Sequence, residues 1–148
     1  MKRVFRLLLA SSLALVAFGY SAQCAAKNDV ALPSAAKEFV AANFADANVK
    51  SVVQQASSDQ KYTATLGDGT VIIFLTSGEW DVVENQVEVT TSFILAPIRE
   101  YVRHRYGRKK ITRISHESYG YAVRLSAGME GQEVDLRFDG KGVFLPQQ

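Results

Sequence analysis

Cysteine is nearly absent from this chain, which contains one, Cys24, among 148 residues. A disulfide scaffold is therefore excluded, and the hydrophobic core must supply the stability. The chain also lacks the apolar runs of about 20 residues that a membrane bundle needs. With 47% hydrophobic and 22% charged residues, it lacks the low hydrophobicity of a disordered chain as well. The composition is that of a globular protein with one domain or two very small ones.

Patterns typical of catalytic and metal sites are equally scarce. The two histidines, His104 and His116, do not lie at ligand spacing from another histidine or from the cysteine. Residues 67–69 (Gly-Asp-Gly) stand between two expected strands, where they favour a hairpin turn over a phosphate-binding loop. Ser115, His116 and Glu117 are neighbours on an expected strand, so their side chains alternate between faces, unlike a catalytic triad. We therefore predict no enzyme activity, no cofactor and no metal.

The N-terminus has the pattern of a secretory signal peptide. Three cations among the first six residues precede a 12-residue apolar core at 7–18, and small residues follow. This core is too short to span about 30 Å of hydrocarbon comfortably, so no stable membrane span is expected after cleavage. We predict that residues 1–26 are a signal peptide, cleaved before Ala25 or Lys27, and that the mature protein is periplasmic or secreted. Lipidation at Cys24 is the disfavoured alternative.

Charge is divided unevenly along the expected mature chain. Residues 27–98 carry four cations and nine anions, a charge of −5, whereas residues 99–148 carry ten cations and six anions, a charge of +4. A candidate basic patch could meet an acidic protein, lipid head groups or another polyanion. The alternative is a solvated helix face that balances the acidic half. Export and the mature charge argue against nucleic acid as a partner. The basic patch consists of Arg99, Arg103, Arg105, Arg108, Lys109 and Lys110.

Two segments, 32–84 and 94–146, share one order of patterns. Each opens with apolar residues at helical spacing and continues with four strand-like runs separated by turn glycines. We predict an α+β, two-layer fold of two tandem helix-plus-four-strand antiparallel repeats, with the first repeat and its connection at 27–93 and the second at 94–148. A coincidental likeness of the two halves is the alternative. Because four strands from about 50 residues are marginal alone, the units should join edge to edge or share a core.

One expected strand, within 70–76, is apolar on both faces. If Ile72 and Phe74 face the core, then Val71, Ile73 and Leu75 line the opposite sheet face, where water would be expected. An exposed apolar stripe on a sheet indicates an interface. The three side chains are therefore the candidate partner-binding site, unless the other half or the 85–93 connection covers them. Trp80 is of a residue type that anchors interfaces and is added to this candidate site.

These residues together resemble the PepSY-like, β-lactamase-inhibitor-like families of exported bacterial proteins. The resemblance rests on the leader and on short motifs in both halves, and it covers nearly the whole mature chain. It departs from the pattern where Phe144 stands in place of a tryptophan. The motifs are Leu32-Pro33, Phe39-Val40, Asn43-Phe44 and Gly78 to Trp80 in the first half, and Tyr101-Val102, Arg105-Tyr106, Gly120-Tyr121 to Leu125 and Phe138 to Gly142 in the second.

The resemblance implies a small envelope domain that binds rather than catalyses, built of tandem units whose sheet clasps a partner. No catalytic residue carries over. We therefore expect an exported, non-catalytic binding module that binds or inhibits an envelope protein, peptide or hydrolase through a sheet face. The alternative is a small-ligand or metal-handling periplasmic protein that uses His104, His116 or acidic residues. The sequence does not indicate the oligomeric state.

Overall fold

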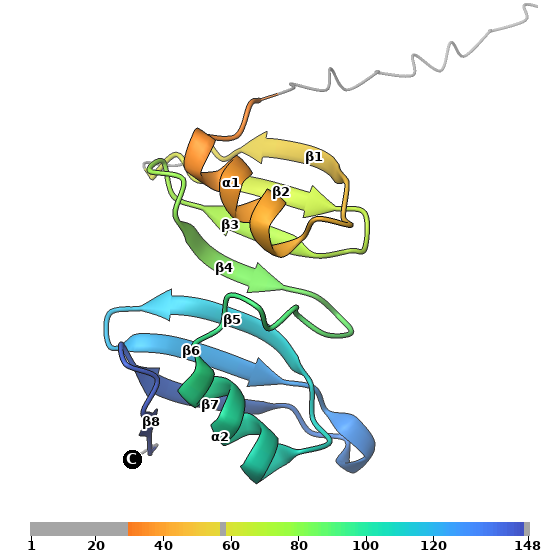
Figure 1. Cartoon of the computed structure of the whole chain (residues 1–148), viewed down its shortest axis with the longest axis vertical. Coiled ribbons are helices and arrows are strands. Elements are labelled where there is room, and N and C mark those ends of the chain that lie inside the picture. Colours follow the sequence, from red (N-terminus) through yellow and green to blue (C-terminus); the bar gives the residue numbers. More distant parts are fainter. Residues whose placement is uncertain (1–29, 57–58, 147–148) are drawn as a thin grey trace, which may run out of the picture.

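The computed structural model describes residues 30–56 and 59–146, and the expected signal peptide lies outside them. Within the described residues, no helix is long and apolar enough to cross a membrane. Each of the two α-helices is followed by four strands (Figure 1). The elements are α1 (Ser34–Asn43), β1 (Val49–Gln54), β2 (Tyr62–Leu66), β3 (Val71–Phe74), β4 (Trp80–Glu84), α2 (Ala96–Tyr106), β5 (Ile111–Glu117), β6 (Gly120–Leu125), the 3₁₀ turn η1 (Gly128–Glu130), β7 (Val134–Asp139) and β8 (Phe144–Leu145).

All eight strands form one antiparallel sheet in which each strand pairs with the next along the chain. Short turns set the pairing within each half. The two halves join where β4 pairs with β5, through Val82 with Ser115, Val83 with Ile114 and Glu84 with Arg113. This confirms the expected α+β class and the edge-to-edge join. The turn η1 between β6 and β7 was not predicted.

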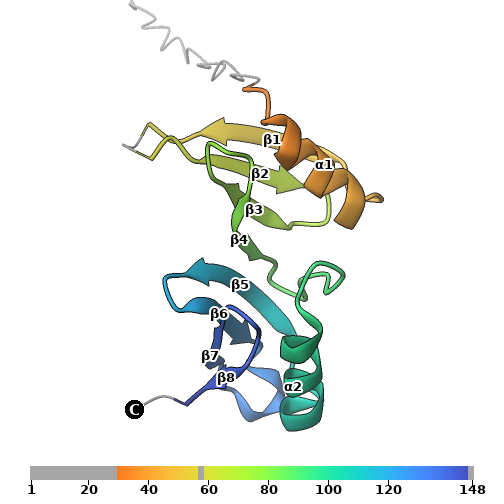
Figure 2. The same cartoon turned by 60° about the vertical axis from the view of Figure 1, so that its left-hand side comes forward.

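Both helices pack on the same face of the sheet (Figure 2). Ala36 and Val40 of α1, with Ile98 and Val102 of α2, belong to one buried cluster. The strand residues of this cluster lie two apart where a strand is regular, because successive side chains point to opposite faces, whereas a bulge in β5 separates Ile111 from Ile114 by three residues. They are Ala64, Leu66, Ile72, Phe74, Val83, Ile111, Ile114, Val123, Leu125, Leu136 and Phe138.

The connection between β4 and α2 packs on the helix-covered face. Val89 is fully buried, and its backbone N–H donates to the Ile111 carbonyl at 2.7 Å. Phe93 contacts Phe39 and Trp80, with ring centroids 5.2 Å apart in both cases. This connection joins the core on the helix side, so none of the helices or connections that the structure describes covers the other face of the sheet.

Candidate functional site

The face of the sheet opposite the helices is the first candidate site, and we call it the open sheet face. Val71 and Ile73 lie on it, as the alternation in their strand predicts, and both are half-buried. Leu75, just beyond the end of β3, is also half-buried and lines a groove with Phe39 of α1. Neighbouring strands on the same face cover part of Val71 and Ile73. Ile73 pairs with Thr63 of β2 and with Val82 of β4.

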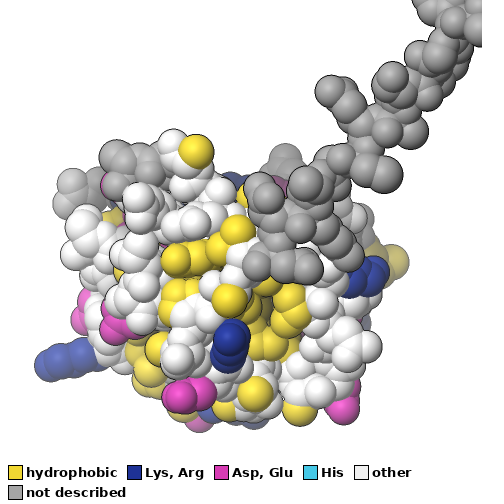
Figure 3. All heavy atoms as spheres, turned by 90° about the horizontal axis from the view of Figure 1, so that it is seen from above, with side chains coloured by type: hydrophobic (Ala, Val, Ile, Leu, Met, Phe, Trp, Pro, Cys, Tyr) yellow, Lys and Arg dark blue, Asp and Glu magenta, His cyan; other side chains and the backbone are white. Residues whose placement is uncertain are grey.

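Exposed apolar side chains lie along the β1 edge of the sheet, on both of its faces. Val53 of β1, which pairs with Thr63, is 57% exposed. Val49 at the start of the same strand is also exposed, but it pairs with the core residue Leu66 and so lies on the helix-covered face. Figure 3 looks onto this end of the molecule and shows hydrophobic side chains gathered there. Because β1 is the first strand of the sheet, this apolar area lies at an edge, where a strand of another chain can pair.

The other half of the open sheet face is charged. Arg113 lies 3.5 Å from the Glu84 carboxylate, and Arg124 donates from Nε to Asp135 at 2.8 Å. The hydrogen bond to Asp135, followed by the charge of that carboxylate, raises the pKa of Arg124 above its usual range. Arg137 lies over the Tyr119 ring at 5.6 Å from its centroid. None of these residues was included in the predicted site, although the same alternation assigns them to this face.

Two adjoining hollows cross the open sheet face. One, of about 270 Å³, extends from Val71 and Glu84 to Arg113 and Arg124. The other, of about 390 Å³, continues from these two arginines toward Tyr119 and Arg137. The apolar Val71 therefore borders a shallow surface that is otherwise largely charged. Such a mixture suits contact with a protein surface or peptide better than enclosure of a small molecule.

Trp80, the fourth predicted partner-binding residue, lies on the helix-covered side instead. The β4 bulge pairs it with the core residue Phe74, so it does not share the face of Ile73. Its ring stacks on the exposed His116 at 4.0 Å, and its carbonyl lies 2.8 Å from His116 Nδ1. A groove of about 530 Å³ nevertheless brings Trp80 together with Leu75, Phe39 and His116. The His116 contact could not be inferred from sequence, because it depends on the long-range β4–β5 register.

The candidate basic patch divides into free and engaged cations. Lys110 forms a salt bridge to Glu88 at 3.1 Å. Lys109 Nζ donates to three backbone carbonyls, so its side chain holds a loop. In residues 30–56 and 59–146, no carboxylate forms a salt bridge with the remaining four members of the patch. These exposed members are Arg99, Arg103, Arg105 and Arg108.

The histidines do not assemble a metal centre in the described part of the chain. No group of three or more His, Cys, Asp or Glu side chains there is arranged to hold a metal ion. His104 is exposed on α2, with Nε2 3.4 Å from the Arg103 guanidinium. The alternative of a metal-handling protein therefore gains no built site from these residues.

Comparisons with known proteins point to one family. A family model described as "Putative beta-lactamase-inhibitor-like, PepSY-like" matches residues 60–146. No match was found among curated proteins.

Several solved structures share the fold. A protein of Bacteroides vulgatus described as "putative periplasmic protein of unknown function" is 27% identical, with a TM-score of 0.66, over 78% of this chain and 90% of that chain. A "putative calcium-regulated periplasmic protein" of Bacteroides thetaiotaomicron is 25% identical, with a TM-score of 0.68, over 78% and 88%. A second periplasmic protein of Bacteroides vulgatus, 24% identical, has a TM-score of 0.64 over the same shares.

Proposed function

This chain belongs to the PepSY-like, β-lactamase-inhibitor-like family, and from that premise we propose that it is an exported, non-catalytic module that binds an envelope protein or peptide through its open sheet face. One observation carries the proposal. Both helices and the 85–95 connection cover one face of the eight-stranded sheet, and no described element covers the other. A periplasmic location is supported by the descriptions of the Bacteroides relatives.

We also propose that the two halves arose from one duplicated unit, with boundaries at 27–93 and 94–148. Equivalent aromatic contacts support it. Phe39 of α1 meets Phe74 edge-on, with interplanar angle 81°, and stacks on Trp80 at 26°. Tyr101 of α2 meets Phe138 at 84° and stacks on Phe144 at 14°. In each half the helix aromatic thus covers the third strand and the start of the fourth.

The test of the binding face is site-specific photo-crosslinking in the envelope. A photoreactive amino acid is placed at Ile73 on the open sheet face or, as the matched control, at the exposed Lys37 of α1. We expect a discrete adduct with one envelope protein from position 73 and none from position 37. The same adducts from both positions, or none from position 73, would refute the proposed face.

The partner identified in this way is then purified, and its affinity for variants is measured. We expect Ile73→Asp to weaken binding by at least tenfold, because a carboxylate would be desolvated at an apolar contact without a partner. Lys37→Asp places the same group on α1 and should leave the affinity unchanged. Circular dichroism confirms that both variants fold.

Within this proposal, the partner class suggested by the family description is a hydrolase. Purified protein is titrated into a β-lactamase assay and, separately, into assays of envelope peptidases. Inhibition that Ile73→Asp abolishes would identify the target class. Binding of the crosslinked partner without loss of its activity would instead assign a binding role without inhibition.

The export part of the proposal has its own measurement. N-terminal sequencing of the protein recovered from the envelope should begin at Ala25 or Lys27. A chain that retains residue 1, or that carries a lipid at Cys24, would contradict the proposed cleavage.

A small-ligand protein is the second candidate, favoured by the groove that Leu75, Phe39, Trp80 and His116 line. Trp80 is the only tryptophan of the chain, so its fluorescence reports directly on this groove. A relative described as calcium-regulated makes calcium the first metal to test, followed by zinc and copper. Calorimetric heat together with a change in Trp80 fluorescence would support this alternative, and the absence of both would remove it.

A further inference from the structure

The loop that follows β6 is anchored to the end of α2 by one lysine. The Lys109 ammonium donates to the carbonyls of Ser126 at 3.2 Å, Ala127 at 2.8 Å and Gln132 at 2.8 Å. A lysine has three N–H donors, so the loop carbonyls can engage all of them. The turn η1 lies inside this loop and is capped by Gly131, whose φ is +73°. Lys109 therefore fixes the loop instead of contributing a free surface charge.

The tip of this loop presents an apolar side chain to water. Met129 is 98% exposed, the highest value among the exposed large hydrophobic residues. Transfer of such an exposed methionine side chain from water into an apolar environment lowers the free energy of the system. Since Lys109 holds the loop in place, Met129 is presented at a defined position and not on a free end.

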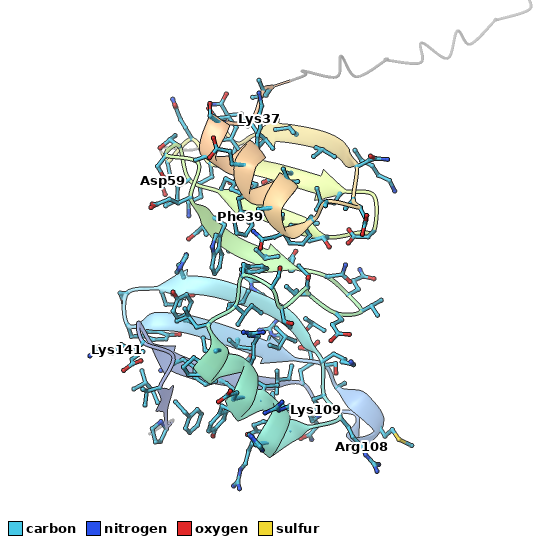
Figure 4. The ribbon with its side chains drawn as sticks, in the orientation of Figure 1. Lys37, Phe39, Asp59, Arg108, Lys109 and Lys141 are labelled. Carbon is cyan, nitrogen blue, oxygen red and sulfur yellow. The ribbon has the colours of Figure 1, made fainter. Side chains whose placement is uncertain are left out.

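Two arginines for which the described residues offer no salt bridge lie beside this methionine. Arg105, Arg108, Tyr106 and Met129 line one hollow of about 650 Å³. The described lining residues include no carboxylate, and no salt bridge in the described ranges engages either arginine. Figure 4 shows Arg108 and Lys109 together at the C-terminal end of α2, well away from Lys37 and Lys141.

We propose that this end of the molecule, defined by Arg105, Arg108 and Met129, docks on an anionic phospholipid bilayer. The guanidinium groups bind lipid phosphates, and the Met129 side chain enters the boundary between head groups and acyl chains. A bilayer supplies both matching parts at once, negative charge at the surface and hydrocarbon just below it. A soluble polyanion matches only the arginines, and a single protruding methionine has no role in binding it.

This inference is independent of the open sheet face, so a module held at the membrane would keep that face for its partner.

The experiment is co-sedimentation of the protein, purified from the envelope fraction, with vesicles of phosphatidylglycerol and phosphatidylethanolamine. Vesicles of phosphatidylcholine alone are the neutral comparison. We expect binding only to the anionic vesicles, with loss as salt is raised.

Variants then separate the two parts of the surface. Arg105→Ala/Arg108→Ala should lower the partition coefficient roughly 25-fold, since each cation near an anionic surface contributes about fivefold. The matched control Lys37→Ala/Lys141→Ala removes the same charge elsewhere and should change partition less than about twofold. Met129→Ser should lower partition roughly tenfold, as expected when about two methylene-sized groups no longer leave water.

Three results would overturn the proposal. The first is absence of binding to anionic vesicles. The second is equal loss in the arginine pair and its lysine control, which would reveal a general charge effect. The third is full binding by Met129→Ser together with equally tight binding of soluble polyglutamate, which would assign the arginines to an acidic protein instead. All substituted side chains are exposed, and Met129→Leu, which keeps the apolar character, should restore binding.

Discussion

Gly78 in the β3–β4 turn is the position where the contact between α1 and the sheet can be tested most sharply. Its φ is +88°, and a Cβ built there would lie 2.9 Å from the Ala35 Cβ and 3.0 Å from the Ala36 nitrogen. The N-terminus of α1 therefore rests directly on this turn. Gly69 in the β2–β3 turn has the same φ of +88° but no atom within 4 Å of an added Cβ. The two glycines therefore have the same φ, and they differ in that only Gly78 lies against a helix.

The expected cost of Gly78→Ala follows from this comparison. At both positions alanine must adopt a left-handed conformation, which costs about 1–2 kcal/mol. At Gly78 it must also displace the start of α1, and overpacking of this kind adds about 1–3 kcal/mol. We therefore expect Gly78→Ala to lower the free energy of unfolding by about 2–5 kcal/mol, against about 1–2 kcal/mol for Gly69→Ala.

Equilibrium unfolding in urea measures both values. Gly142 adds an intermediate case, with φ +83° and a built Cβ 3.2 Å from side-chain atoms of Ile98 and Pro97 at the start of α2. The expected order of destabilisation is Gly78, then Gly142, then Gly69. Equal losses at Gly78 and Gly69 would refute the inference that close approach of the turn positions the helix.

Three further substitutions test other contacts. Trp80→Ala should cost about 3 kcal/mol of unfolding free energy, because the ring loses its aromatic neighbours, as thermal or urea unfolding followed by far-UV circular dichroism will measure. Lys109→Met should speed hydrogen exchange of amides in 126–132 and leave exchange in β2 unchanged. Asp81→Asn should cost about 0.5–1 kcal/mol at neutral pH. The hydrogen bond to Asp81 raises the pKa of Lys61, so between neutral pH and about pH 10.4 this contribution is full, and it disappears as the pH rises through the raised value. Unfolding measured from neutral to alkaline pH will show the two proteins converge above that value.

The arrangement within each strand follows from sequence, because side chains alternate and hairpins are short. Alternation placed Ile72 and Phe74 in the core and Val71 and Ile73 on the other face, as the structure has them, whereas Leu75, beyond the end of β3, lines the groove beside Phe39. It also applies to the arginines of β5 to β7, which the predicted site omitted. The identity of the covered face was beyond this reasoning, since it depends on which side of the sheet the helices and the connection pack.

Trp80 and Lys109 illustrate what local pattern leaves open. A bulge near the start of β4 shifts the register, so Trp80 faces the helices while Val82 lies on the open sheet face. From the sequence, Lys109 was assigned to the basic surface patch. In the structure its ammonium donates hydrogen bonds to three carbonyls that lie 17 to 23 residues further along the chain. Neither a bulge nor a distant carbonyl leaves a periodic signal.

By itself, the sequence determined the class of this protein: the order of helices and strands, the faces within each strand, the shortage of catalytic groups and the basic character of its second half. These properties are local, since they depend on residue type and on periods of two or 3.6 residues. Only the tertiary structure decided that both helices share one face, that β4 joins β5 into a continuous sheet, and that Met129 shares a hollow with Arg105 and Arg108. Those outcomes arise from contacts between residues far apart in the chain, which form only when the whole core is buried together.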